Sequence, residues 1–424
     1  MANFWQKIKL IFKDPDLRKK ILFVLAMLAT FRLFATIPIP GVDPIKLHSF
    51  LEGNQFFGLL NIFSGGALSN LSIVMLGVGP YITATIIMQL LTMLIPRLKE
   101  IYQEEGEAGR KRFNQYSRFL TVPLAFLQGY ALLLMLEKQE VLGHLTIFGR
   151  ITNIVIVMAG SVLLMWIGEL ITEYGIGNGV SLMIFAGIVA RIPSDIQQTL
   201  FTFDPSQVPL ILGFLIAGFL IVAGVIVVTE GERPIPVSYA KRIRGMRVYG
   251  GVSTYLPLRV NQAGVIPIIF ALSILLFPQM LANFLAGVQN AAIQGAAHMI
   301  VGAMSNAWVY ATLYFGLVFL FTYFHSAVTF DPEAISSNLQ KSGAFVPGIR
   351  PGRPTAEYLS KTLTRITLVG AVFLGLIAVL PLAMRAITGL VALTIGGTAL
   401  LIVVSVVLET IKQIQAQVVM REYE

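Results

Sequence analysis

Side chains that could perform chemistry are few in this chain, and they are widely separated. The four histidines, His48, His144, His298 and His325, form no His-Glu-x-x-His pair of the kind that holds catalytic zinc. There is no cysteine, which excludes disulfides, thiol catalysis and cysteine-ligated metals. We therefore expect no metal site, and we interpret each histidine as a packing residue.

The glycine-rich segments lack the spacing of a nucleotide site. Gly175, Gly177 and Gly179 alternate with single residues, follow no predicted strand, and are not accompanied by a Gly-x4-Gly-Lys-Ser/Thr loop. This pattern indicates a close-packed turn between two helices. We expect no cofactor and no enzymatic activity.

Proton-coupled and ion-coupled transporters place acidic groups inside their membrane spans, because such groups are costly there and are kept for function. The candidates here are Glu169 and Glu173, and both are predicted at the cytoplasmic end of a span, with the carboxylate reaching water. Arg32 and Arg191 are predicted near the outer ends of their spans, where they can snorkel. Ion coupling is therefore poorly supported, and a ten-span secondary solute transporter is kept only as the alternative function.

Composition identifies the elements that carry these residues. With 56% hydrophobic and 12% charged residues among 424, the sequence is typical of an all-α integral membrane protein. Apolar runs of suitable length predict ten transmembrane helices. They cover approximately residues 21–37, 73–95, 118–136, 151–171, 180–199, 208–228, 263–286, 307–328, 365–384 and 389–408.

Charge placement predicts how these spans are oriented. Of the 31 Lys and Arg residues, 25 fall in alternate segments, namely 1–20, 97–118, 229–262, 329–365 and 409–424. Basic loops remain on the cytoplasmic side of a membrane. The sequence therefore predicts a multi-pass protein of the cell inner (cytoplasmic) membrane with both termini in the cytoplasm.

A stretch of 44 residues, 53–96, contains no Asp, Glu, Lys or Arg, which is too long for one span. Its first half is interrupted by Gly65-Gly66 and contains several Ser and Asn residues, whereas residues 71–96 have the composition of a continuous helix. Irregular backbone at membrane depth occurs only where it is buried in protein or lines a watery cavity. The pattern predicts a short element inside a cavity, followed by a span, as in a channel or transporter.

Two cytoplasmic loops, 229–262 and 329–362, are longer than charge bias alone requires. The first is predicted to form a β-hairpin with a basic tip that presents Lys241, Arg242, Arg244 and Arg247. The second is rich in Pro and Gly, which turn the backbone sharply and would display Arg350. The two loops are either ordinary solvated basic loops or a docking surface for a partner with acidic or phosphate groups, such as ribosomal RNA.

At these residues the chain resembles the SecY family, the channel subunits of the bacterial protein-conducting translocon. The resemblance extends along nearly the whole chain and rests on motifs in order. They are Ile37-Pro-Ile-Pro-Gly41, Phe63-Ser-Gly-Gly-Ala-Leu68, Gly79-Pro-Tyr-Ile82, Gly106-Glu-x-Gly-Arg110, Gly175-Ile-Gly-Asn-Gly179, Tyr239-Ala-Lys-Arg242, Asn261-x-Ala-Gly-Val-Ile-Pro267, Lys341 to Gly352, and Gly396-Gly-Thr-x-Leu-Leu-Ile402.

The resemblance implies two pseudo-symmetric halves, residues 1–200 and 201–424, around a central pore closed by a plug at about 56–72. An aliphatic ring at the constriction would exclude ions without binding a passing chain. The implied ring residues are Val78, Ile82, Val180, Ile184, Ile269 and Ile402. The implied plug residues are Asn61, Phe63, Ser64, Gly65, Gly66, Leu68, Asn70 and Leu71.

The resemblance further implies a lateral gate and a set of partners. Thr83, Gln89 and Ser273 would be polar positions on the gate helices, through which apolar segments leave for the lipid bilayer. The cytoplasmic loops, with Arg350 and Arg242 foremost, would bind the SecA motor or the ribosome. SecE and SecG would be companion subunits, and signal peptides and unfolded preproteins would be the cargo.

Overall fold

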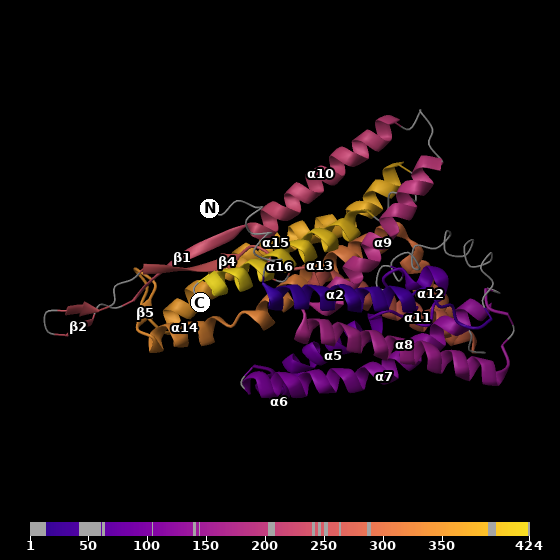
Figure 1. The fold of residues 1–424 in the computed structure, drawn as a ribbon, viewed down its shortest axis with the longest axis horizontal. Coiled ribbons are helices and arrows are strands. Elements are labelled where there is room, and N and C mark those ends of the chain that lie inside the picture. The colour runs from indigo at the N-terminus through magenta and orange to yellow at the C-terminus, as the bar shows by residue number, and fades with distance from the viewer. Residues whose placement is uncertain are drawn as a thin grey trace. The chain divides into compact units, whose positions relative to one another are not determined.

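The computed structural model describes residues 14–41, 61, 64–103, 105–138, 141–143, 145–201, 208–239, 242–244, 247–249, 253–262, 264–285, 290–388 and 396–422. These residues form long helices and two small sheets, which confirms the all-α class (Figure 1). They divide into two compact units. The first holds residues 1–208, 272–310 and 406–424, and the second holds 209–271 and 311–405, so that α11, α13 and α16 each contribute to both. The predicted halves, 1–200 and 201–424, stay a prediction.

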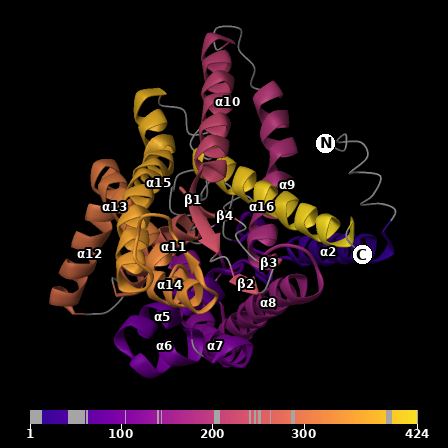
Figure 2. The same ribbon diagram turned by 90° about the vertical axis from the view of Figure 1, so that its left-hand side faces the viewer.

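The first unit is built mainly from helices of the N-terminal half of the chain, joined by α12 (Ala291–Ser305). Its N-terminal elements are α2 (Pro15–Phe34), η1 (Ala67–Asn70), α5 (Gly79–Leu94), α6 (Pro96–Gln103), α7 (Gly106–Lys138), α8 (Ile147–Tyr174) and α9 (Gly179–Phe201). Helices α5, α7 and α8 pack side by side, as the view in Figure 2 shows. Helix α2 begins where the Asp14 carboxylate accepts hydrogen bonds from the Asp16 and Leu17 amides, with Pro15 in the first turn.

The second unit contains most of the remaining elements. Its helices are α10 (Val208–Glu230), α13 (Ala307–Thr329), α14 (Pro332–Lys341) and α15 (Arg353–Thr388), and it shares α11 (Ile266–Leu285) and α16 (Gly396–Glu422) with the first unit. Its strands are β1 (Glu232–Tyr239), β2 (Arg242–Arg244), β3 (Arg247–Tyr249), β4 (Ser253–Arg259) and β5 (Ala344–Phe345).

A helix overlaps each of the ten predicted spans. Among the described residues, five helices are long and apolar enough to cross a membrane, and α5 with α6 is a sixth candidate if the pair, bent by 116°, is counted as one span. Three shorter apolar segments lie at Gly179–Ser194, Leu215–Glu230 and Ile266–Leu275. The chain is therefore a multi-pass membrane protein by composition and helix length, consistent with ten spans.

The prediction of continuous helix from residue 71 was wrong, because α5 begins only at Gly79. Residues 71–78 form turns, and Gly77 adopts φ +60. This irregular backbone is buried against α8, where Ser161 Oγ donates to the Gly77 carbonyl at 3.1 Å. A Cβ at Gly160 would overlap the Ile73 carbonyl. The turns therefore follow the rule that non-helical backbone at membrane depth is enclosed by protein.

The predicted hairpin in loop 229–262 is confirmed. Strands β1 and β4 pair antiparallel from Glu232↔Arg259 to Ser238↔Ser253, and β2 and β3 continue the hairpin toward its tip (Figure 1). The sequence did not indicate that β5, from the loop 329–362, also pairs with β1 and gives a sheet of order β4-β1-β5. Ile235, Leu258, Val346 and Leu359 form the buried core beneath this sheet. The two loops are therefore one folded platform.

Candidate functional site

The predicted plug is a compact segment that satisfies its own polar groups. The Asn61 side chain accepts a hydrogen bond from the Ser69 amide, and Ser64 Oγ accepts one from the Leu68 amide. Ser69 Oγ donates to the Gly66 carbonyl at 2.6 Å. Of the predicted plug residues, Asn61, Ser64, Leu68 and Leu71 are buried, Asn70 is exposed, and Phe63 lies outside the described residues.

The plug backbone lies directly against two helices of its own unit. A Cβ at Gly65 would stand 2.5 Å from the Phe31 ring of α2, and a Cβ at Gly187 of α9 would overlap the Gly65 backbone. Gly65 and Gly66 have φ of +62 and +84, a left-handed conformation that glycine adopts without strain. The glycine pair therefore allows both a sharp turn and a close approach that a larger residue would prevent.

The end of the plug is joined to the chain that follows α2. The Ile39 amide donates to the Leu71 carbonyl, and the Ile73 amide donates to the Ile37 carbonyl, both at 2.9 Å. Asn70 Nδ2 also donates to the Ala35 carbonyl at 3.3 Å. Leu71 itself has φ +40, which is uncommon for a residue with a side chain.

The six predicted ring residues are divided between the two units. In the first unit, Val78 and Ile82 are buried at the start of α5, where the Ile82 amide donates a hydrogen bond to the Val78 carbonyl. Val180 and Ile184 of the same unit lie in the first turns of α9. In the second, Ile269 on α11 and Ile402 on α16 are both buried. Five of the six lie in helices and Val78 is the residue just before α5, and their role as a ring stays a prediction.

The three predicted gate residues are placed on α5 and α11. Thr83 Oγ1 bonds to the Gly79 carbonyl within its own helix at 3.0 Å, and Ser273 is buried at 6% exposure. Gln89 Oε1 is buried and has no hydrogen-bond partner among the described residues.

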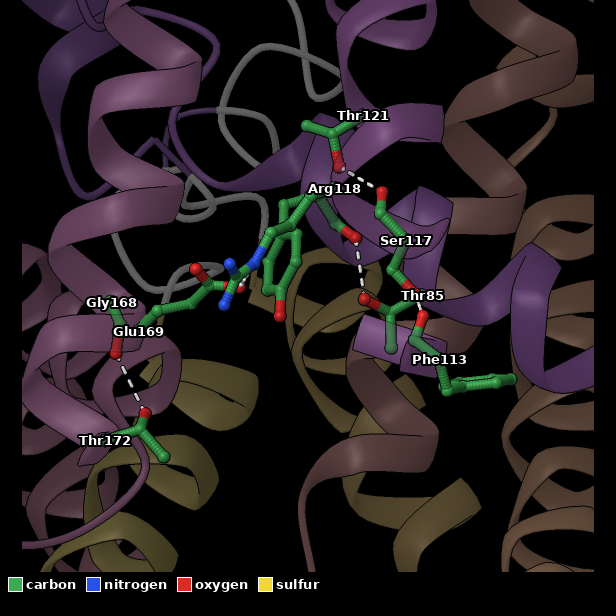
Figure 3. Close-up of polar contacts among 9 residues, drawn as sticks. Thr85, Phe113, Ser117, Arg118, Thr121, Gly168, Glu169 and Thr172 are labelled. Carbon is green, nitrogen blue, oxygen red and sulfur yellow. Dashed lines mark hydrogen bonds and ion pairs between the residues drawn. The ribbon is translucent and has the colours of Figure 1, made fainter. Parts of the chain in front are cut away.

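Glu169, predicted to reach water, has a side chain that is partly buried and paired with another helix. Glu169 Oε1 lies 2.7 Å from Arg118 Nε, so α8 and α7 are joined by an ion pair, which Figure 3 shows. The Tyr81 hydroxyl of α5 also hydrogen-bonds to Glu169. The side chain of Glu169 is only 14% exposed, while Glu173, four residues later, is exposed as expected. The pair therefore serves to join helices.

The histidines form no metal site within the described part of the chain, where no cluster of three potential ligands occurs. His298 is exposed on α12, and the ring of His325 lies edge-on to Phe270 at 6.1 Å between centroids. His48 and His144 lie outside the described residues.

The platform presents Arg350 on a rigid turn. Ser336 Oγ of α14 donates to the Gly352 carbonyl at 2.6 Å, and Thr355 Oγ1 of α15 donates to the Arg350 carbonyl at 2.8 Å. Gly348 and Gly352 have φ of +83 and +93, so the backbone reverses on both sides of Arg350, whose side chain is exposed. Arg242, Arg244 and Arg247 lie on β2 and β3, and Lys241 lies outside the described residues.

Comparison with known proteins identifies the family. The SecY family model matches residues 72–411. The chain belongs to the SecY family. The "Protein translocase subunit SecY" of Corynebacterium glutamicum is 44% identical over 434 residues, covering 97% of this chain and 98% of the relative. That of Streptomyces galbus is 45% identical over 431 residues, with 97% of each covered.

Solved structures show that the SecY fold is present. The chain of "The structure of a protein conducting channel" has a TM-score of 0.66 at 18% identity, covering 93% of this chain and 91% of that one. Sec61 in the canine ribosome-channel complex has a TM-score of 0.63 at 18% identity, with the same coverage. This SecY chain is a protein translocase subunit with a protein-conducting channel fold, and the solute-transporter alternative is not supported.

Two features of the site escaped sequence reasoning. Arg32, interpreted as a snorkelling residue, instead donates to the Gly65 carbonyl of the plug at 2.8 Å. Strand β5 was also missed, because two residues are too few for a periodic signal. The signal for Arg32 was its charge inside a predicted span, because a charged group in a span is costly without a partner.

Proposed function

We propose that this SecY protein is the passive, gated pore of its translocase. It moves unfolded secretory polypeptides across the cytoplasmic membrane and releases apolar segments sideways into the lipid. The observation that carries this proposal is the docked plug, a buried, self-bonded segment enclosed by α2 and α9. The hydrogen bonds within the segment can keep its conformation when its contacts with α2 and α9 break, which suits a stopper better than a structural loop.

The proposed constriction consists of Val78, Ile82, Val180, Ile184, Ile269 and Ile402. An apolar collar loses water and so blocks ions, yet it offers no fixed hydrogen-bond partner to a passing chain. The proposed gate includes Thr83, Gln89 and Ser273, since polar contacts between membrane helices contribute only about 0.6 kcal/mol on average. Weak contacts of this kind let a signal peptide separate the helices.

The driving force comes from a partner, since the proposed pore residues carry no catalytic group. SecA and the ribosome are the proposed motors, and SecE and SecG are the proposed companion subunits. Support for a ribosomal partner comes from the neighbour named Sec61 in a ribosome-channel complex and from the basic platform that carries Arg242 and Arg350. Ribosomal RNA would bind such a surface through its phosphates. The platform then faces the cytoplasm, as do both termini.

The collar is tested by ion conductance of bilayers that contain the purified resting channel. Replacing Ile82 and Ile184 together by Gly should raise the conductance, because the dry collar would widen. The matched control replaces Ile154 and Ile167, two buried isoleucines of α8, by Gly. Equal conductance in both variants, or no change in the first, would refute the collar.

A further inference from the structure

We propose that Arg32 on α2 is the latch that holds the plug in its closed position. This inference rests on the proposed function, because it takes the segment from Asn61 to Leu71 as the plug of the channel. It adds a positioning residue outside the plug and outside the proposed ring. Arg32 is a positioning residue, because it acts by holding the plug in the closed channel.

The latch is a charge-assisted hydrogen bond across two elements. Arg32 Nη1 donates to the Gly65 carbonyl at 2.8 Å, from a half-buried position on α2. Hydrogen bonds to ionised groups are shorter and about twice as strong as those between neutral groups. Partial burial limits competition from water, so this bond is well placed to hold a small segment.

The packing around Gly65 makes the bond from Arg32 specific to the docked plug. The Gly65 backbone is confined by the Phe31 ring on one side and by Gly187 on the other. Because Arg32 is adjacent to Phe31 on α2, it meets the carbonyl only while the plug occupies this seat. A chain that displaces the plug must break the bond.

A latch needs a hinge, and the other end of the plug supplies one. Leu71 is held by the bond from the Ile39 amide to its carbonyl and has the left-handed φ of +40. The backbone bond from Ile73 to Ile37 fixes the chain just beyond it. The plug is therefore anchored at its C-terminal end and released at Gly65, six residues earlier.

Arg191 of α9 provides a natural comparison. Its Cγ lies 3.9 Å from where a Cβ of Gly66 would be, next to Arg32 Nη1 at 3.5 Å from the same point. Two arginines thus flank the same glycine, but Arg191 meets it through its aliphatic stem. Each substitution removes one positive charge from a side chain that touches the plug, whereas only Arg32→Met removes the bond to Gly65.

The experiment compares Arg32→Met with Arg191→Met in the full channel complex. Since the chain has no cysteine, Ala67→Cys places a single reporter thiol in the plug, at a fully buried position. Maleimide labelling from the outer side and resting ion conductance are measured for each variant. We expect Arg32→Met to raise the labelling rate about tenfold or more, as loss of a charged hydrogen bond predicts, with conductance rising in parallel. Arg191→Met should leave both within about twofold of the parent.

Each outcome decides the question. Equal increases in both variants would assign the effect to charge and overturn the latch. If Arg32→Met changes neither the labelling rate nor the conductance, either Arg32 does not hold the plug or this segment is not the plug. Replacing residues 61–70 by a Gly-Ser linker distinguishes these two explanations. A leaky linker variant would then refute the latch and leave the plug in place, whereas a tight one would refute the plug itself.

Discussion

Glu169 Oε1 of α8 accepts a hydrogen bond from Arg118 Nε of α7 at 2.7 Å, and the two partners differ in exposure. The Glu169 side chain is 14% exposed and the Arg118 side chain is 45% exposed. Removing one partner of such an ion pair leaves the other charge without its partner, and the loss of stability depends on how buried the remaining group is.

We expect Arg118→Leu to destabilise the protein more than Glu169→Gln. The first change leaves a largely buried carboxylate without its charged partner, at a cost of about 2 kcal/mol after discounting for solvent. The second leaves a guanidinium that can turn to water, at a cost of about 1 kcal/mol or less. Thermal unfolding in detergent measures both, and a larger loss for Glu169→Gln would contradict the assignment.

Arg350→Glu should abolish partner-driven export, because it reverses the charge displayed by the rigid turn of the platform. Export of a secretory protein into vesicles is the measurement, with the melting temperature as a check on folding. Arg353→Glu is the matched control, since Arg353 is equally basic and exposed and its ion pair with Glu357 is solvent-exposed. Normal export by Arg350→Glu would exclude it as a docking residue.

Ser336→Ala should lower export partially, because it removes the 2.6 Å bond that holds the Gly352 carbonyl below Arg350. A buried hydrogen bond of this kind contributes about 1 kcal/mol, which loosens the turn without unfolding α14. Ser342→Ala provides the control, because Ser342 Oγ donates only to Leu339 within its own turn. The idea fails if the two variants export equally well.

Gly187→Ala should displace the plug and raise resting conductance, because the new methyl group would overlap the Gly65 backbone. Alanine is otherwise favoured over glycine inside a helix by about 1 kcal/mol, so α9 itself should not suffer. Gly213→Ala in α10, where a Cβ would meet nothing within 4 Å, is the control. Unchanged conductance in Gly187→Ala would show that the plug does not rest on α9.

The sequence predicted the helical class, a helix overlapping each proposed span, and the platform hairpin, because apolar runs and β-branched arms are local signals. It could not predict that α5 starts at Gly79, since the turns before it are stabilised by α8 through Ser161 and Gly160. Contacts distant in sequence also determine the pairing of Arg118 with Glu169 and of Arg32 with Gly65. Pairings of this kind have no periodic signature.

Strand β5 pairs with β1, so segments more than 100 residues apart share one set of backbone hydrogen bonds. Through β1 the sheet continues into α10, and through the turn at Arg350 it continues into α15. A force applied to either loop is therefore felt at the base of both helices together. The two loops are in this way coupled through one sheet rather than being independent segments.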